Sequence, residues 1–522
     1  MGFDASPTDR SMSGSSTRSR LTRRGLLKAA LVVVPAGLAA ATGGIGGLWA
    51  TADVNTAGKT RFVNRLAVPP LAPSRRDRSG RRVYDLRAAV GSRRFRSGRA
   101  TVTWGVNGDY LGPTLRAARG EKVLVNVRNE LGEPTTMHWH GMHLPAAMDG
   151  GPHQMIEPGA AWSPTWTIDQ PAATLWYHPH PHARTALHVY RGLAGLFIVD
   201  DPKAGTLGLP SRYGVDDVPV IVQDKKFTDT DQFSAERPMM GGTGILGDAI
   251  LVNGTLAPFH EVTTQRTRLR LLNASTARVY DFGFSDDRPF ALVGTDGGLL
   301  PAPFHTTRVQ LSPGERAEIV VTLRPTERVT LRSYPPDLGT DLWNSRFTGG
   351  DDTLDILELC AGHVLGSSPA LPGVLAERPD LETAGAVTRS FELGGHRING
   401  RRMDMSRIDF AVAKDTTEIW QITNCGNTPH NFHVHDVQFQ VLSVGGADPT
   451  PELSGWKDTV YVPPNAPVRI AVRFKDYTDP AVPYMYHCHL LYHEDQRMMG
   501  QFTVTDRGDA PKTSPSHGHH GA

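Results

Sequence analysis

Three short stretches of the chain alternate apolar and polar residues, and each ends in asparagine. They are Lys122–Asn129, Thr267–Asn273 and Glu418–Asn424. Alternation is typical of a β-strand, because successive side chains point to opposite faces of a sheet. Repeated strand and turn segments without helical periodicity predict β-sandwich modules.

An Asn-Gly turn pair precedes each stretch at a constant spacing. The pairs begin at Asn107, Asn253 and Asn399, which are 146 residues apart in both intervals. Asn-Gly is common in turns, so the three pairs alone are weak support. The constant spacing and the similar continuation indicate one ancestral module used three times.

The modules differ nine residues after the terminal asparagine. The first module there begins His138-Trp-His140, and the third begins His433-Val-His435. The middle module has Phe282-Gly-Phe284 at the same offset. We interpret this difference as metal chemistry that the middle copy has lost.

Composition supports a chain of many short strands. The chain has 54 Gly and 39 Pro, which long helices tolerate poorly and strands joined by turns tolerate well. The 39% of hydrophobic residues suffices for large cores. The net charge of +2 leaves no strong field for nucleic acid, and three cysteines exclude a disulfide scaffold.

We therefore predict an all-β chain with three consecutive β-sandwich domains, at residues 66–202, 215–363 and 384–508. A linker is predicted at residues 51–65. Residues 509–522 are predicted to form a flexible tail. Binding of a loose metal ion is the alternative for its three histidines, His517, His519 and His520.

Residues 1–50 have the pattern of an export signal. Arg23-Arg24 precedes the apolar run 29–41, which is shorter than the ~20 residues of a membrane span and ends in small residues. The paired arginines resemble the twin-arginine type. We expect export by the twin-arginine machinery to the periplasm, the cell surface or the medium, with no stable membrane span in the mature protein. A retained membrane anchor is the alternative.

Ten of the 21 histidines lie in four short clusters. In a strand, residues i and i+2 face the same way, so each His-x-His motif aims two imidazoles into one space. Neutral imidazole binds Cu, Zn, Fe or Ni, so the histidines alone leave the metal open. The clusters are His138/His140, His178/His180, His430/His433/His435 and His487/His489/His493.

Cys488 decides between these metals. With His430 and His493 it makes a set of two histidines and one cysteine, and Met498 follows His493 by five residues. A trigonal set with a weak axial thioether is a blue-copper electron-transfer site, whereas zinc has no redox chemistry. Cys488 also stands between two histidines, so on an extended strand its sulfur points away from their rings.

These motifs resemble the multicopper oxidase family, of the three-domain, laccase-like kind. The resemblance covers residues 66–506 and includes the segments 176–180, 192–199 and 487–495. Within the family it is strongest to bacterial cuprous oxidases and bilirubin-oxidase-like enzymes. It implies three cupredoxin-like Greek-key domains, the middle one without copper ligands.

The resemblance implies four copper ions. One type 1 copper takes His430, Cys488, His493 and Met498. One type 2 copper takes His138 and His433. Two type 3 coppers take the remaining six histidines: His140, His178, His180, His435, His487 and His489. Single electrons from a donor would enter at the type 1 copper, and dioxygen would be reduced to water at the other three.

Oxygen reduction consumes protons, and Asp149 and Glu494 match the family's acidic residues near the three-copper centre. The resemblance implies that they relay protons and orient ligands. Ordinary structural carboxylates are the alternative.

The class of electron donor is predicted from the absence of methionine, a soft sulfur ligand, where cuprous oxidases carry it. Thr428 stands where cuprous oxidases offer methionine, and no methionine occurs between Met240 and Met403. This favours laccase-like oxidation of phenolic or aromatic donors over oxidation of Cu(I) for copper tolerance. A non-catalytic copper-binding or structural export protein is a third possibility, which the intact ligand set disfavours. A monomer suffices for any of them.

Other residues depart from the family pattern or match no ligand position. Asn431 and Asp436 replace the usual Pro and Gly, so we expect a more polar type 1 site. Cys360 and Cys425 are expected to be buried thiols, with a disulfide as the alternative. Four further histidines are expected to form hydrogen bonds or line the rim: His143, His153, His182 and His188.

Overall fold

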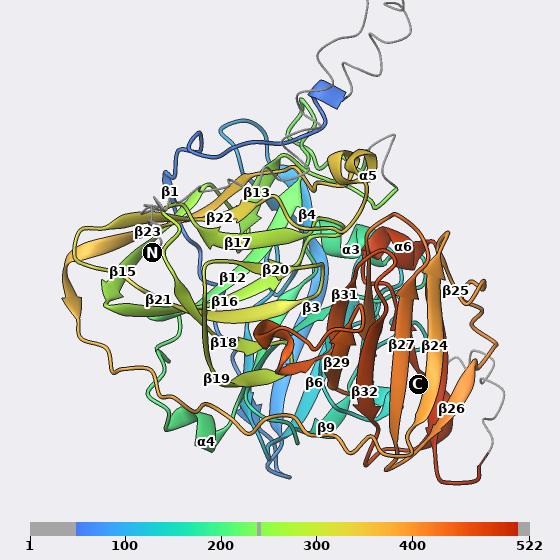
Figure 1. The fold of residues 1–522 in the computed structure, drawn as a ribbon. Coiled ribbons are helices and arrows are strands. Elements are labelled where there is room, and N and C mark those ends of the chain that lie inside the picture. The colour runs from blue at the N-terminus through green and yellow to red at the C-terminus, as the bar shows by residue number, and fades with distance from the viewer. Residues whose placement is uncertain (1–48, 237–241, 510–522) are drawn as a thin grey trace, which may run out of the picture. The chain divides into compact units, whose positions relative to one another are not determined.

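The computed structural model of the chain describes residues 49–236 and 242–509 (Figure 1). Nearly all of the predicted export signal and of the histidine tail lies outside these residues, as does Met240. The described residues from Asp53 onward form one compact unit. Within the described ranges, no helix is long and apolar enough to cross a membrane.

The prediction of an all-β chain is confirmed. The described strands form six sheets, two for each module. The first module combines a sheet of β2 (Arg75–Arg76), β3 (Arg82–Arg93), β4 (Thr101–Val106), β6 (Lys122–Glu130), β8 (Ala161–Trp162) and β9 (Thr165–Thr167) with one of β5 (Leu115–Ala118), β7 (His138–His140), β10 (Ala173–His178) and β11 (Gly195–Asp200).

The second module has the larger pair of sheets. One contains β1 (Asn64–Arg65), β15 (Pro258–Thr264), β17 (Tyr280–Phe284), β20 (Val309–Leu311), β22 (Arg328–Tyr334) and β23 (Leu354–Gly366). The other contains β12 (Asp217–Lys225), β13 (Ala249–Val252), β14 (Thr255–Leu256), β16 (Arg266–Asn273), β18 (Phe290–Thr295), β19 (Gly298–Thr306) and β21 (Arg316–Thr322).

The third module follows the same plan. One sheet contains β24 (Val387–Gly394), β25 (Arg397–Ile398), β27 (Thr417–Asn424), β29 (Phe439–Val444), β30 (Trp456–Lys457) and β32 (Val468–Arg473). The other contains β26 (Phe410–Ala413), β28 (His430–Val434), β31 (Thr459–Val462), β33 (Asp479–His487) and β34 (Met499–Thr505).

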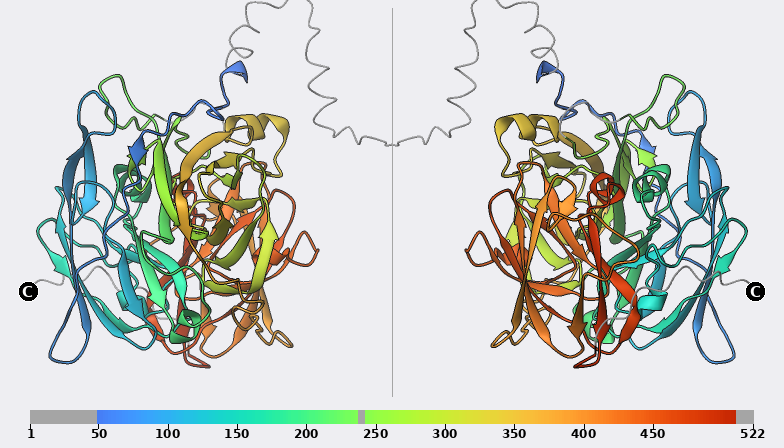
Figure 2. Two further views of the ribbon diagram at one scale, coloured as in Figure 1. Left: turned by 90° about the vertical axis from the view of Figure 1, so that its left-hand side faces the viewer. Right: turned by 90° about the vertical axis from the view of Figure 1, so that its right-hand side faces the viewer.

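The described helices are short connections. They are α3 (Thr185–Arg191), α4 (Pro202–Gly205), α5 (Leu342–Phe347) and α6 (Leu491–Asp495), with single 3₁₀ turns η1 (Ala146–Met148) and η2 (Pro451–Leu453). The first and third modules lie side by side (Figures 1 and 2), and η1 of the first packs on β33 of the third. This contact brings the histidine-bearing strands of both modules together.

The internal repeat is visible in the hydrogen bonds of the turn asparagines. Asn107, Asn253 and Asn399 all have positive φ, which asparagine tolerates better than most residues. The side-chain oxygen of each asparagine accepts a backbone N–H from β3, β12 or β24. Its side-chain nitrogen donates to the backbone carbonyl two residues before that N–H. These strands, β3, β12 and β24, pair in parallel with β6, β16 and β27.

The asparagines that end the alternating strands also share one role. Asn129, Asn273 and Asn424 are fully buried, and each donates to two backbone carbonyls and accepts the N–H two residues ahead. They fix the loops that lead to the next motif. In the middle module this motif supplies Phe282 and Phe284 to the apolar core instead of histidines.

The predicted linker joins the second module. β1 pairs in parallel with β15, and the Val54 N–H donates to Asp352 Oδ1 at 2.7 Å. Residues 53–65 therefore add an edge strand to this module.

Candidate metal centres

Strand pairing brings the histidine motifs together. In the first module β7 lies antiparallel to β10, with His138 opposite His178. In the third module β28 lies antiparallel to β33, with His433 opposite His487. Since residues two apart on a strand face the same way, each pair of strands presents its imidazoles to one space.

Eight buried imidazoles from the two modules meet in one nest. Their ring nitrogens form three groups in which the atoms lie within 4.8 Å of one another: His138/His140/His433, His140/His178/His489 and His180/His435/His487. His140 also stacks on His433 at 3.8 Å between ring centroids. The predicted meeting of the outer modules is thus present in the structure.

Each ring turns one nitrogen toward the middle of its group. His178 Nε2 lies 3.4 Å from His140 Nδ1 and 3.5 Å from His489 Nε2. His487 Nε2 lies 3.2 Å from His180 Nε2 and 3.3 Å from His435 Nε2.

The opposite ring nitrogens are held from outside the nest. His138 Nδ1 donates to the Asp149 carbonyl at 2.9 Å, and His433 Nδ1 donates to the Asp458 carbonyl at 2.8 Å. His178 Nδ1 donates to the Pro179 carbonyl at 2.9 Å. These bonds place the proton outside, so a lone pair on the other nitrogen faces the nest.

The nest is suited to cations. Nε2 of His138 and Nε2 of His433 are buried without a hydrogen-bond partner. Burial, reinforced by neighbouring imidazoles, lowers the pKa of His140, His178 and His433 well below the ordinary value, so the rings are neutral. Neutral imidazoles with converging lone pairs are metal donors, and without a cation such unpaired polar atoms would be costly.

A separate group surrounds Cys488. Its Sγ lies 3.5 Å from Nδ1 of both His430 and His493, and these two nitrogens are 3.0 Å apart. Met498 is buried in the same core. Burial raises the pKa of the Cys488 thiol to about 12, so a thiolate at this position requires a neighbouring positive charge. Two imidazoles and one thiol in this arrangement fit copper.

Cys488 connects the two centres along the chain. His487 belongs to the group of His180 and His435, and His489 belongs to the group of His140 and His178. Both residues adjoin the cysteine, so two covalent paths run from its sulfur into the histidine nest.

The sequence of the whole chain agrees with this geometry. Multicopper oxidase family models match residues 89–204, 216–332 and 376–508. The chain belongs to the multicopper oxidase family. The three matched regions correspond to the three cupredoxin-like modules, as the sequence predicts.

Individual relatives are similar over most of their length. "Cell division protein FtsP" of Sodalis glossinidius is 39% identical over 84% of this chain and 92% of its own. "Multicopper oxidase mco" of Staphylococcus haemolyticus is 36% identical over 85% and 93%. The crystal structure of a laccase from Pediococcus acidilactici superposes with a TM-score of 0.78 at 36% identity, over 86% and 95%.

A laccase-like multicopper oxidase, CueO, from the lignin-degrading bacterium Ochrobactrum sp. is also similar in structure. It has a TM-score of 0.76 and 35% identity, and it covers 84% of this chain and 100% of its own. That protein is described as having oxidase activity towards lignin model compounds and lignosulfonate.

The two predicted acidic residues lie against the histidine nest. Asp149 Oδ2 accepts from His435 Nδ1 at 2.7 Å. The two carboxylate oxygens of Glu494 each lie 3.3 Å from an Nδ1 atom, one of His180 and one of His487. Burial raises the pKa of Glu494 well above the ordinary value. A role for either residue in proton transfer stays a prediction.

Asp458 is a contact of the nest that the sequence did not reveal. Its Oδ1 accepts from His140 Nε2 at 3.0 Å and from Arg316 of the second module at 2.7 Å. Its backbone carbonyl holds His433, so one residue orients two imidazoles from different modules. The only local signal is a Lys-Asp pair before an apolar strand, which predicts nothing about a distant histidine.

Asn431, noted as a departure from the family pattern, lies between the two centres. Its Oδ1 accepts the His489 N–H at 2.6 Å and is 3.7 Å from Cys488 Sγ. Its Nδ2 donates to Ser312 Oγ and the Pro313 carbonyl. The expected polar neighbour of the cysteine is therefore present and fully satisfied.

The histidines and cysteines that match no ligand position agree only partly with the expectations. His143 bonds to Asp436 and Asp476, and His188 bonds to Glu133. Cys360 and Cys425 are both free; Cys360 is only partly buried, not buried as expected, and Cys425 is exposed. The expectation that Cys425 is buried is wrong, because it follows the buried Asn424 at the end of β27 and turns to solvent.

Proposed function

We propose that this chain is a laccase-like oxidase, which couples one-electron oxidation of phenolic or aromatic amine donors to four-electron reduction of dioxygen to water. The observation that supports it most is the position of Cys488. Its sulfur faces two imidazoles at 3.5 Å, and its chain neighbours belong to two different imidazole groups of the nest.

The ligands would be divided as the family pattern implies. His430, Cys488, His493 and Met498 would hold the type 1 copper. His138 and His433 would hold the type 2 copper, and the two groups His140/His178/His489 and His180/His435/His487 would hold the type 3 pair. Bound copper would supply one-electron acceptance at the first site and electron delivery to dioxygen at the other three.

The chain's own groups would hold these ligands and supply protons. Asp149 and Asp458 fix the orientation of imidazoles by accepting their outer N–H groups. Glu494 is buried, burial raises the pKa of its carboxyl well above the ordinary value, and its two oxygens lie 3.3 Å from Nδ1 of His180 and of His487. A buried carboxyl in contact with two ligand imidazoles would suit proton transfer in a reaction that consumes protons.

The donor class rests on the residues around the type 1 group. Thr428 offers no thioether near His430, and the similar Ochrobactrum protein is reported to oxidise lignin model compounds. Both observations favour aromatic donors.

A cuprous oxidase is the second candidate, because one cluster of soft sulfur atoms exists in the third module. Met403, Met485 and Met499 pack together with Met405. Thioethers favour Cu(I), although three of these side chains are almost fully buried. A non-catalytic role is the third candidate, because the chain is 39% identical in sequence to a protein named for cell division, FtsP.

Oxygen uptake by the copper-loaded protein separates the three. We expect 2,6-dimethoxyphenol to give a higher kcat/KM than Cu(I). A higher kcat/KM with Cu(I) would favour the cuprous oxidase. No oxygen uptake with any donor, despite full copper loading, would leave the non-catalytic role.

We further propose that residues 1–50 direct export by the twin-arginine route and that the mature protein works as a monomer. The basic segment with Arg23-Arg24 before a short apolar run supports the first proposal. The presence of both ligand-bearing modules in one chain supports the second.

A further inference from the structure

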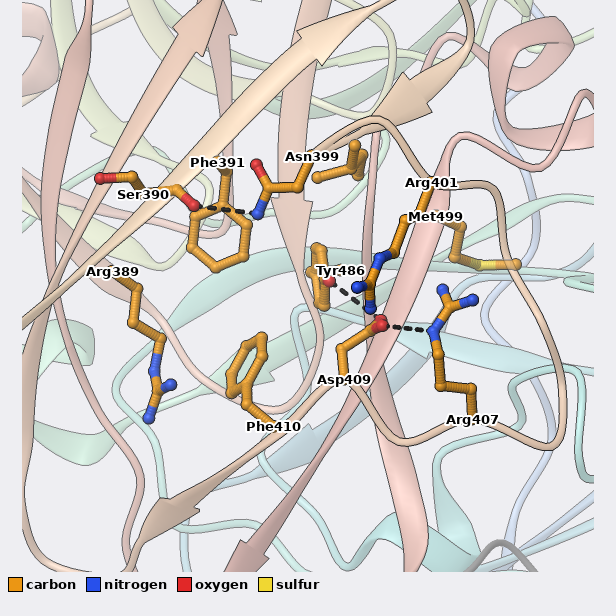
Figure 3. A pocket seen from close by; sticks show the side chains of 11 residues that line it. Arg389, Ser390, Phe391, Asn399, Arg401, Arg407, Asp409, Phe410, Tyr486 and Met499 are labelled. Atoms are coloured by element: carbon orange, nitrogen blue, oxygen red, sulfur yellow. Dashed lines mark hydrogen bonds and ion pairs between the residues drawn. The ribbon is translucent and has the colours of Figure 1, made fainter.

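A cavity of about 440 Å³ opens in the third module, and none of the nest histidines lines it (Figure 3). Three arginines line it: Arg389, Arg401 and Arg407. Three aromatic rings form its walls and floor: Phe391, Phe410 and Tyr486. Such a combination of flat apolar surface and guanidinium groups suits an aromatic ring that carries a negative charge.

The charge of the cavity is only partly compensated. Arg389 forms an ion pair with Glu418 and lies 4.3 Å above the Phe410 ring. Arg407 donates to Asp409 at 2.7 Å. Arg401 is exposed, and among the described residues no carboxylate lies within ion-pair distance of it. Figure 3 shows its guanidinium directed toward Tyr486, where an anionic group of a ligand would meet it.

The floor of the cavity is closely fitted. The Tyr486 hydroxyl donates to Asp409 Oδ2 at 3.0 Å. Gly500 lies beneath this pair, and a Cβ atom there would come within 2.2 Å of the tyrosine oxygen. Glycine is therefore required for Tyr486 to reach the cavity.

Tyr486 links the cavity to the type 1 group. It precedes Cys488 by two residues, so on the extended end of β33 both side chains face the core of the module. Its ring is 5.1 Å from Phe391 and 5.9 Å from Phe432 between centroids, and Phe432 lies between His430 and His433 in the sequence. A ring bound in the cavity is thus a few bonded residues from the copper ligands.

The more direct approach to the type 1 group is covered. His493 is 0% exposed, and its Nε2 donates to the Gly242 carbonyl at 3.1 Å. The His396 ring lies 4.9 Å from it.

We propose that this cavity binds phenols that carry a carboxylate, with the carboxylate on Arg401 and the ring on the aromatic walls, and that it is an electron-entry site of the enzyme. The inference rests on the proposed function. The bound phenol would lose one electron and its phenolic proton. The proton would go to water, and the electron would pass along residues 486–488 to reduce Cu(II) to Cu(I) at the Cys488 group.

The test compares two probes that differ by one carboxylate, syringate and 2,6-dimethoxyphenol, on the copper-loaded full chain. Isothermal titration calorimetry measures binding, and anaerobic bleaching of the blue absorbance measures electron entry. Arg401→Glu should weaken syringate binding by about tenfold or more and slow its bleaching rate at low concentration, because a charge-assisted contact is replaced by repulsion. Values for 2,6-dimethoxyphenol should not change.

Arg402→Glu is the matched control, since Arg402 is the next residue, is also exposed and does not line the cavity. If both variants bind syringate equally and still oxidise both phenols, the cavity is not the binding site of the carboxylate. The proposed function would remain valid. Syringate binding that depends on Arg401, without oxidation of either phenol, would overturn the donor role together with the proposed function.

Discussion

Asp149 of the first module accepts a hydrogen bond from His435 of the third, with 2.7 Å between Asp149 Oδ2 and His435 Nδ1. The same carboxylate lies 3.4 Å from His138 Nδ1. One buried acidic side chain, which belongs to neither His-x-His motif, therefore contacts imidazoles of two modules in the histidine nest.

Asp149→Asn should slow oxygen reduction and spare the type 1 site. The amide can still accept from an imidazole, but it cannot take up or release a proton at this position. We expect kcat to fall by about ten- to a hundredfold, with unchanged blue absorbance. Asp169→Asn, on the exposed surface of the same module, is the control. Unchanged turnover of the Asp149 variant would show that the carboxylate is structural only.

Asp458→Asn should loosen both the nest and the fold. The substitution leaves Arg316 buried with less compensating charge, and breaking a buried ion pair costs about 3–5 kcal/mol. It also weakens the hold on His140, whose ring stacks on that of His433, a ligand of the proposed type 2 site. We expect a lower midpoint in denaturant and a reduced or altered type 2 signal by electron paramagnetic resonance. A variant with normal stability and a normal signal would contradict the positioning role.

His143 should make stability depend on pH. Burial alone would lower its pKa, but Asp436 and Asp476 of the third module raise it to about 9, against an ordinary value of 6.5. Because folding favours the protonated ring, its contribution is complete below about pH 6.5 and is lost as the pH rises through about 9.

Denaturant unfolding of wild type and His143→Gln measures this contribution. The difference in unfolding free energy should be largest near pH 6 and should shrink by on the order of 2–3 kcal/mol by pH 10. Use of the difference removes the effect of other titrating groups. A difference that stays constant over this range would contradict the account.

The paired arginines of the leader can be tested apart from the enzyme. Residues 1–50 fused to a fluorescent reporter should direct export by the twin-arginine route, and Arg23→Lys with Arg24→Lys should retain the reporter in the cytoplasm. Arg18→Lys with Arg20→Lys is the matched control, because it changes arginines outside the pair. Export that survives the first substitution would contradict the assignment.

The sequence predicted the parts of the site that depend on strand geometry. His-x-His motifs on strands must direct both rings to one face, so the shared direction of His138 with His140, and of His433 with His435, could be expected. The meeting of the two pairs was implied by the family resemblance. The constant asparagine spacing likewise predicted equivalent modules, and Asn129 and Asn424 hold their loops by the same hydrogen bonds.

Contacts between distant modules could not be predicted. Asp458 meets His140 across 318 residues of sequence and Arg316 across 142, and no periodicity relates them. The pairing of His143 with Asp436 and Asp476 is of the same kind. The cavity at Arg401 also depends on how β24, β26 and β33 come together, which local patterns do not specify.

The most direct test of the central claim is the metal content and spectrum of the copper-loaded protein beside its Cys488→Ser variant. We predict four copper ions per chain and a blue absorbance for the wild type. The variant should keep three copper ions and the type 2 resonance signal but lose the blue band, because only the thiolate of the group with His430 and His493 is removed. A variant that keeps the blue band, or a wild type that binds no copper at the Cys488 group, would contradict the account.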